Sequence, residues 1–526
     1  MVTESWSRKW SQKLSDQEVR QQNQASQWLG SDGQDDYLTA NLHVNPSSSD
    51  QSPSKSAKSG SSKTSLTSQP KPSLFKGLFK AIAKKLKFDR KSTVAIGLFV
   101  AVSASLGAVL ATILNSKPLQ TRELSDAESL AFAKGDFSSV SLSSLGIPVL
   151  SRPVNILVLG TVVLTTDLPG GADLMQGKHF DQVEGNLEGQ SDSMTMLRFD
   201  PRSDRLVALS IPRDSRVQIE GIGVQKINAA NFVGGAALAA KTTSALLGNV
   251  AIDRYVRINV GGFGQLIDAL GGVEVYVPRP MKYQDDSQHL YINLPEGRQV
   301  LDGAKAIQYM RFRHDDLGDI GRVQRQQTLV RSLIEQKLNL ATVVKIPQIL
   351  ALLKNNIDTN LSTEEMLAVA AFAAKVGRTN TKMLMLPGRF STATEFELSY
   401  WLVNPPKIAQ LMAEYFDLPN PLGSEPQTSP RIAIQDSLKQ AEAVSRARKI
   451  ITALGYGDVR LAEHAWSETL NKTQIVAQAG DIRLAEQLRD RLGIGEIVVE
   501  ATGDLDSDLT LRLGRDWLDH QQGVAP

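Results

Sequence analysis

Arginines, acids and amides are concentrated in one short stretch of this sequence. It begins with Tyr309-Met-Arg-Phe-Arg313 and continues through Gly318-Asp-Ile-Gly-Arg-Val-Gln-Arg-Gln-Gln327. Guanidinium groups match pairs of phosphate oxygens, and the N-terminus of a helix adds an anion site of its own. The residue types therefore predict a pocket for a highly charged phosphate group.

The spacing predicts which elements carry these side chains. Arg311 and Arg313 are two positions apart, so they would share one face of a strand that leads into a helix. Arg322 and Gln326 are four positions apart and would share one face of that helix, continued by the apolar Val330. A buried arginine needs a counter-charge, and a bound phosphate would supply one.

Further charged residues fall where other elements are expected to begin or end. Asp192 leads into one strand, Arg213 and Asp214 end the next, and Lys226 opens a helix. A single Arg–Asp pair would be an ordinary structural ion pair, but six cationic side chains gathered with acids such as Asp319 favour a ligand site. The candidate phosphate ligands are Arg213, Lys226, Arg311, Arg313, Arg322, Arg325 and Gln326.

Composition and motif spacing argue against several other classes of protein. The net charge of +2 over 526 residues indicates no nucleic-acid partner. Gly171–His179 is one residue too long for a P-loop, and His179 stands where that motif needs Ser or Thr. The six histidines lack the spacing of a zinc site, and the chain has no cysteine.

A membrane anchor is predicted near the N-terminus. Thr93–Leu114 carries no charge, and its 22 residues, if helical, would rise about 33 Å, enough for a bilayer core of about 30 Å. Residues 71–91 contain eight Lys or Arg and one acid, which predicts that residues 1–91 remain in the cytoplasm. The alternatives are a buried core helix or a cleaved signal peptide, but a signal peptide lies at the extreme N-terminus.

Patterning predicts the elements that follow the anchor. Val154–Gly160 is an apolar run typical of a buried central strand, and residues 193–211 are predicted to form a hairpin. Ser362-Thr-Glu-Glu365 is a capping box that should open a helix. The predicted divisions are a disordered tail (1–91), a transmembrane helix (92–115), a spacer (116–152), a main domain (153–404), a linker (405–430), a small α/β domain (431–517) and a tail (518–526).

Seven segments together resemble the LytR–CpsA–Psr family of cell-envelope phosphotransferases. The C-terminal part is similar to a domain often attached to that family, and the stretch between Gly160 and Asp192 resembles cyanobacterial members. The matching segments are Asn155–Thr161, Ser191–Met194, Ser210–Asp214, Lys226–Ala230, Asp268–Val275, Leu301–Gly303 and Arg311–Gln327.

The resemblance implies an α/β fold with a central mixed sheet flanked by helices and an apolar tunnel for a polyprenyl tail. The pyrophosphate of that lipid would be bound by the seven candidate ligands. The resemblance also implies that Asp192 and Asp319 orient arginines or a Mg²⁺ ion, with Asp192 as the metal ligand. The residues implied in catalysis are Asp192, Arg213, Arg311, Asp319 and Arg322.

The implied function is transfer of a glycopolymer from a polyprenyl-pyrophosphate carrier to peptidoglycan, by a single-pass inner-membrane enzyme that contacts membrane lipid and faces the periplasm. Two departures bear on this expectation. Val162 stands where family members carry an acid, which Asp167 or Asp173 could replace, and Gln190 stands where they carry Arg. A non-catalytic lipid- or glycan-binding scaffold, a pyrophosphate hydrolase and a transcriptional regulator are the alternatives.

Overall fold

The computed structural model describes one compact unit within Ala101–Pro526. The predicted tail and transmembrane helix, residues 1–115, lie outside the described residues, and no helix within the described ranges is long and apolar enough to cross a membrane. The described residues are 124–140, 148–161, 187–286, 290–313, 318–377, 380–420, 430–462, 466, 468–478 and 480–523.

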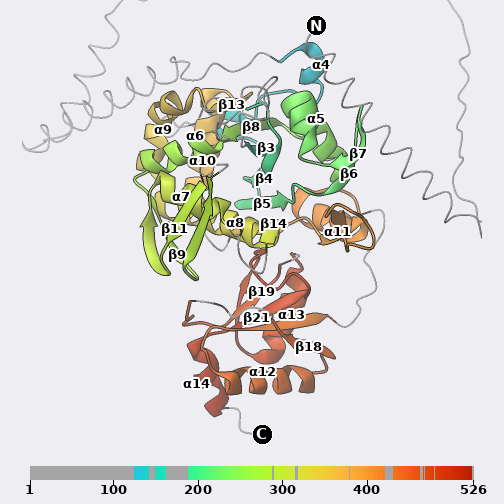
Figure 1. Ribbon diagram of the computed structural model, residues 1–526, viewed down its shortest axis with the longest axis vertical. Helices are drawn as coiled ribbons and strands as arrows, with labels where there is room; N and C mark the ends of the chain where they lie inside the picture. The colour runs from blue at the N-terminus through green and yellow to red at the C-terminus, as the bar shows by residue number, and fades with distance from the viewer. Residues whose placement is uncertain are drawn as a thin grey trace, which may run out of the picture. The chain divides into compact units, whose positions relative to one another are not determined.

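A six-stranded mixed sheet forms the centre of the main domain (Figure 1). In sheet order its strands are β13 (Ile357–Thr359), β8 (Arg254–Asn259), β3 (Val154–Thr161), β4 (Ser191–Asp200), β5 (Arg205–Ile211) and β14 (Thr381–Met385). The predicted central strand is β3, and the predicted hairpin is the antiparallel pair β4–β5. β8 runs parallel to β3 and β14 runs parallel to β5. The mixed α/β class is therefore confirmed.

Helices cover both faces of this sheet, with α5 (Ala229–Leu246) and α10 (Thr363–Lys375) on opposite sides in Figure 1. Side chains alternate along β3, so Leu157 and Leu159 belong to the core cluster of α5, whereas Ile156 packs with residues of α10. The predicted capping box at Ser362 is present and opens α10. A fully buried strand between two helical layers explains the apolar run of β3.

Part of the predicted spacer belongs to the folded domain. After the short helix α4 (Asp126–Ser129), strands β1 (Ser138–Val140) and β2 (Pro148–Leu150) pair with each other. Phe137 and Leu150 join the core cluster that contains the buried face of α10. The spacer prediction is wrong for these residues, because their aromatic and aliphatic side chains complete the core on that side of the sheet.

The predicted strand over Tyr309–Arg313 is wrong, since α7 (Gly303–Arg311) occupies most of it. The Asp302 side chain accepts a hydrogen bond from the Lys305 amide at 2.8 Å and caps this helix. The predicted long helix is α8 (Gly318–Lys337). Neighbouring elements are β6 (Arg216–Ile219), β7 (Gly223–Lys226), α6 (Val260–Ala269), β9 (Val273–Val277), β10 (Met281–Asp285), β11 (Leu290–Leu294), β12 (Gly297–Leu301) and α9 (Leu340–Leu353).

The predicted linker is also wrong over its first half. The chain passes through a hairpin, β15 (Gly388–Phe390) and β16 (Trp401–Val403), into α11 (Pro405–Phe416). α11 buries Ile408, Leu411 and Tyr415 in the main core cluster. Two of the prolines that suggested a linker, Pro405 and Pro406, stand in its first turn, where the N–H that proline lacks would have no helical partner.

The C-terminal domain is a second α/β layer with strand order β18-β17-β21-β19-β20. Its elements are β17 (Arg431–Asp436), α12 (Ala441–Ala453), β18 (Asp458–Leu461), β19 (Gln474–Val476), α13 (Ile482–Leu492), β20 (Glu496–Val498), β21 (Leu509–Leu513) and α14 (Arg515–Gly523). The repeated strand–helix–strand pattern is confirmed, and α14 extends into the predicted tail. The Met383 amide of β14 donates to the Val499 carbonyl at 3.0 Å, so this domain meets the edge of the central sheet.

Candidate functional site

Charged residues at the ends of β4, β5 and β7 form an alternating chain of acids and cations. Arg213, just after β5, donates through Nη1 to the Asp192 carboxylate at the start of β4. Its Nε lies 3.6 Å from the Asp214 carboxylate, which also lies 2.9 Å from the Lys226 ammonium. The hairpin β4–β5 brings Asp192 and Arg213 together because its open end places the start of one strand beside the end of the next.

The C-terminal end of α7 adds two more cations to this cluster. Arg313 Nη2 lies 3.9 Å from Asp192 Oδ1, and the Arg313 side chain is 48% exposed. Burial lowers the pKa of Arg311, the Asp192 charge raises it and the Arg313 charge lowers it. Asp192 is therefore a common counter-ion for arginines from two separate parts of the chain, and the excess of guanidinium groups suits an anionic ligand.

The buried face of α8 differs in part from the prediction. Arg322 is only 3% exposed, as expected for the inward stripe, but Gln326 is partly exposed. Arg325 is buried and donates to the Phe312 carbonyl while its guanidinium stacks 5.4 Å from the Phe312 ring centroid. Arg325 thus holds the corner between α7 and α8, and its role as a phosphate ligand stays a prediction. Asp319 lies in the first turn of α8, and its side chain is outside the described ones.

Two residues near this cluster, Gln327 and Tyr400, were not predicted as site residues from the sequence. Gln327 donates through Nε2 to the Ser210 hydroxyl at 2.9 Å and to the Leu384 carbonyl at 3.0 Å, so it ties α8 to the ends of β5 and β14. Tyr400 lies with its ring centroid 5.6 Å from the Lys226 ammonium. Gln327 adjoins the predicted ligand Gln326, but no local signal connects Tyr400 with a residue so distant in the chain.

Uncharged polar residues precede Asp192 in the chain and lie on the neighbouring strand end. The buried Thr161 and Ser191 hydroxyls, paired in register at the ends of β3 and β4, have no hydrogen-bond partner within the described part of the chain. Gln190 accepts from the Asn228 amide at 3.1 Å. Because Gln190 is neutral and stands where an arginine was expected from the family resemblance, this side of the cluster carries one cation fewer.

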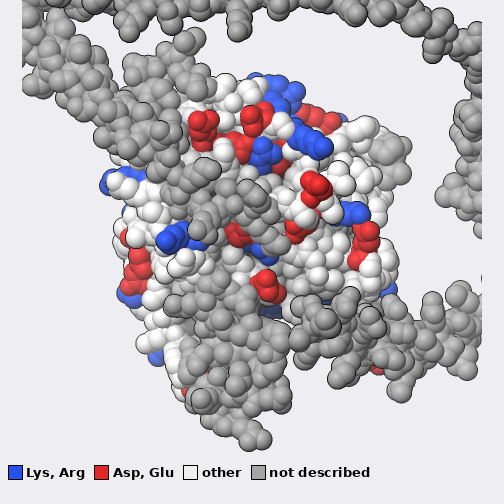
Figure 2. Space-filling view, turned by 90° about the horizontal axis from the view of Figure 1, so that it is seen from above, with Lys and Arg blue, Asp and Glu red and all other residues white. Residues whose placement is uncertain are grey.

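The described residues offer few ligands for a metal. They contain no group of three His, Cys, Asp or Glu side chains that could hold an ion. Asp192 is the carboxylate nearest the arginines, and it already accepts from Arg213. Figure 2 shows one face of the molecule, on which basic and acidic side chains of the described residues lie intermixed.

Comparisons with known proteins match two separate parts of the chain, one that contains the six-stranded sheet and one that contains the C-terminal sheet. Residues 125–416 match the LytR_cpsA_psr family, and residues 429–517 match the family described as LytR cell envelope-related transcriptional attenuator. The likeness of the stretch after Gly160 to cyanobacterial members stays a prediction, since residues 162–186 lie outside the described ones.

Individual relatives match the main domain. The polyisoprenyl-teichoic acid–peptidoglycan teichoic acid transferase TagU of Oceanobacillus iheyensis is 33% identical over 241 residues, which are 44% of this chain and 72% of TagU. The regulatory protein MsrR of Staphylococcus aureus is 31% identical over 209 residues, 39% of this chain and 62% of MsrR. The crystal structure of B. subtilis TagV, 26% identical, covers 51% of this chain and 98% of its own, with a TM-score of 0.42.

Proposed function

Because the chain belongs to the LytR–CpsA–Psr family, we propose that it is a phosphotransferase that moves a glycopolymer from a polyprenyl-pyrophosphate carrier to peptidoglycan. The observation that carries the proposal is the convergence of Arg213, Arg311 and Arg313 on Asp192. The name of the relative TagU, a teichoic acid–peptidoglycan transferase, supports the same class of substrates. Peptidoglycan and a polyprenyl-linked glycopolymer would be its partners.

The arginine cluster accounts for the chemistry of such a transfer. An acceptor hydroxyl oxygen would form a bond to the phosphorus that carries the glycopolymer, while the bond from that phosphorus to the bridging oxygen breaks. Polyprenyl phosphate leaves with the electron pair, and the hydroxyl proton passes to a base. Arg213, Arg311 and Arg322 would stabilise the charge on the phosphoryl oxygens, and Asp192 would keep Arg213 oriented toward them.

The lipid part of the substrate requires an apolar cavity and a nearby membrane. Each buried methylene contributes about 0.8 kcal/mol, so a long isoprenoid tail favours an extended apolar channel. We propose that this channel opens within the apolar layer between the sheet and α5, where Leu157, Leu159 and Met194 belong to the core cluster. The uncharged segment Thr93–Leu114 would anchor the enzyme in the inner membrane, with its N-terminus cytoplasmic and its domains periplasmic.

Magnesium remains a proposal with one protein ligand. Mg²⁺ is commonly held by one or two carboxylates together with substrate phosphates, and Asp192 could supply one such carboxylate. A bound ion would spread the charge of the phosphate oxygens. Asp192 already accepts from Arg213, so the substrate phosphates would have to supply most of the negative charge around the ion. No step above depends on the ion.

One observation favours a second function. Gln190 is neutral and is held by Asn228, so the site carries less positive charge than the family resemblance leads us to expect. A site with less positive charge could bind the carrier lipid without transfer and act as a scaffold. It could also transfer the phosphoryl group of the bound lipid to water and act as a hydrolase. Both alternatives use the same arginines and differ in the product.

The test is a reconstituted transfer assay with the full-length protein in lipid, labelled donor and purified peptidoglycan. Arg311→Ala and Arg322→Lys should abolish or strongly reduce labelled peptidoglycan while thermal unfolding stays close to wild type. The control is Arg446→Ala on α12, whose side chain is 55% exposed. Full transfer by both site variants would refute the proposal. Free labelled glycopolymer would instead indicate a hydrolase, and bound lipid without product a scaffold.

A further inference from the structure

A cavity of about 610 Å³ lies between the main domain and the C-terminal domain. The main domain contributes the hairpin β15–β16 and the first turn of α11. The C-terminal domain contributes the start of β17, Gln478 and the loop Leu505–Asp508. Its volume falls within the range of roughly 300–1,000 Å³ that is typical of ligand sites. Neither domain encloses it alone.

Strand β16 forms the wall between this cavity and the arginine cluster. Trp401, a lining residue, donates its backbone N–H to the Asp214 carbonyl at 2.9 Å. The Asp214 carboxylate lies 2.9 Å from Lys226 and 3.6 Å from Arg213. Leu386, on another wall, donates its N–H to the Ser210 carbonyl at the end of β5. A molecule in the cavity would therefore lie one strand away from the predicted phosphate ligands.

The lining carries charges of both signs. Asp508 accepts from Lys407 at 3.1 Å and from Arg431 at 3.3 Å, which brings the α11 ammonium and the β17 guanidinium to one carboxylate. Arg389, which Glu395 binds at 2.6 Å, and the exposed Asp506 complete the charged groups at the wall. Three cations balanced by three acids suit a ligand that is rich in hydroxyls and carries both ammonium and carboxylate groups. A second polyanionic phosphate would be repelled by the acids, and a lipid tail would leave the charges without solvent.

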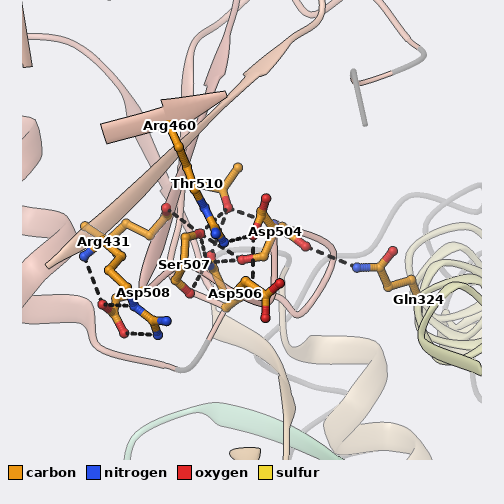
Figure 3. A network of polar contacts seen from close by, with 11 residues as sticks. Gln324, Arg431, Arg460, Asp504, Asp506, Ser507, Asp508 and Thr510 are labelled. Atoms are coloured by element: carbon orange, nitrogen blue, oxygen red, sulfur yellow. Dashed lines mark hydrogen bonds and ion pairs between the residues drawn. The ribbon is translucent and has the colours of Figure 1, made fainter. Parts of the chain in front are cut away.

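The loop that closes the cavity is held rigidly (Figure 3). Gln478 is 3% exposed and donates through Nε2 to the Asp504 and Ser507 carbonyls, both at 2.7 Å. Arg460 binds the Asp504 carboxylate at 2.8 Å, and Gln324 of α8 donates to the Gly503 carbonyl at 3.2 Å. A wall that is already ordered before binding reduces the entropy that a ligand must overcome.

We propose that this cavity binds the acceptor, a peptidoglycan glycan strand with its charged peptide substituents. This inference rests on the proposed function, because the arginine cluster would hold only the donor and the acceptor needs a site of its own. The cavity lies one strand, β16, from Asp214, so a glycan strand that continues past the edge of β16 would bring a hydroxyl to the phosphate. Its peptide substituents would pair with Asp506 and, in competition with Glu395, with Arg389. The C-terminal domain then contributes half of the acceptor site.

The experiment uses the full-length protein with Asp506→Asn and Arg389→Gln, neither of which touches the arginine cluster. Matched controls are Asp490→Asn on α13, 67% exposed, and Arg446→Gln on α12, 55% exposed. Binding of soluble, muramidase-released peptidoglycan fragments is measured without donor, and both substrates are then titrated in the transfer assay. Each site variant should raise the dissociation constant and the acceptor KM about tenfold, the loss of one charged hydrogen bond, with donor KM and kcat unchanged.

Several outcomes would overturn the inference: wild-type protein that binds no fragments, site variants that bind as tightly as the controls, or a rise in donor KM equal to that in acceptor KM. The two proposals can fail separately. Protein that binds fragments through Asp506 and Arg389 but transfers nothing supports the cavity and refutes the phosphotransferase. Protein that transfers normally in all variants supports the phosphotransferase and refutes the cavity.

Discussion

Replacement of Glu500 by glutamine should weaken the C-terminal domain strongly. The Glu500 side chain is 3% exposed and accepts from Arg331 of α8 and, at 2.6 Å, from Arg512, whose side chain is fully buried. Arg512 also donates to Gln435 at 2.8 Å and lies 3.6 Å from the Trp466 ring centroid. Glu500→Gln keeps the shape of the side chain but leaves two guanidinium groups facing a neutral amide.

The expected loss follows from the burial of this network. Removal of one partner of a buried ion pair costs about 3–5 kcal/mol, because the remaining charge stays out of water. The amide oxygen of glutamine can still accept one hydrogen bond, so we expect the lower end, about 3 kcal/mol. With a urea dependence of about 1–1.5 kcal/mol per molar for a domain of this size, the unfolding midpoint should fall by about 2–3 M.

The assay is urea unfolding of the full-length protein, followed by tryptophan fluorescence with Trp466 and Trp517 as reporters in the C-terminal domain. The control is Glu442→Gln on α12, where the carboxylate is 93% exposed and lies 4.0 Å from Arg446. An exposed pair of this kind contributes well under about 1 kcal/mol. A midpoint for Glu500→Gln that matches the control would refute the reasoning, since the buried charges would then be compensated in some other way.

Three further outcomes are expected. Ser362→Ala removes the cap of α10 and should cost about 1 kcal/mol in thermal unfolding, and no loss would contradict the capping argument. The hydrogen bond from Arg389 lowers the pKa of Glu395 from 4.5 to about 2, so stabilisation of the β15–β16 loop is present above pH 4.5 and lost as pH falls toward 2. Hydrogen exchange of residues 388–403 should show this loss in wild type but not in Glu395→Gln. Asp192→Asn should raise the Mg²⁺ concentration for half-maximal transfer at least about tenfold, whereas an unchanged Mg²⁺ dependence would exclude Asp192 as a ligand.

Elements with strong local signals could be predicted from the sequence. β3 was predictable because an apolar run with no charge can only be a buried segment, and α10 because its capping box marks the first turn. The prediction of a strand over Tyr309–Arg313 was wrong because the alternating large and charged residues of this segment fit a strand as well as a helix. The cap at Asp302 and the burial of Tyr309, whose pKa burial raises to about 12, decide for the helix.

The site could be predicted only where its residues lie on elements that follow each other directly in the chain. Asp192 and Arg213 could be placed together because both flank one hairpin, and hairpin geometry fixes which strand ends are adjacent. The contact of Lys226 with Tyr400 depends on how β16 crosses the end of β5, and no periodicity records such a crossing. The contact of Arg325 could not be predicted from the sequence pattern either. A buried arginine can donate its hydrogen bonds to a backbone carbonyl, here that of Phe312, as well as to a ligand.

Helix α8 connects the two domains through its opposite faces. Residues two apart on a helix point about 200° away from each other, so Arg322 faces the interior of the main domain while Gln324 faces the C-terminal domain and donates to the Ala501 carbonyl at 3.0 Å. Arg331, seven residues after Gln324, lies on that same outer face and binds Glu500. The helix that carries a predicted phosphate ligand is therefore held from behind by the C-terminal domain. Loss of the Glu500 charge should for this reason weaken donor binding as well as stability, although Glu500 belongs to the opposite domain.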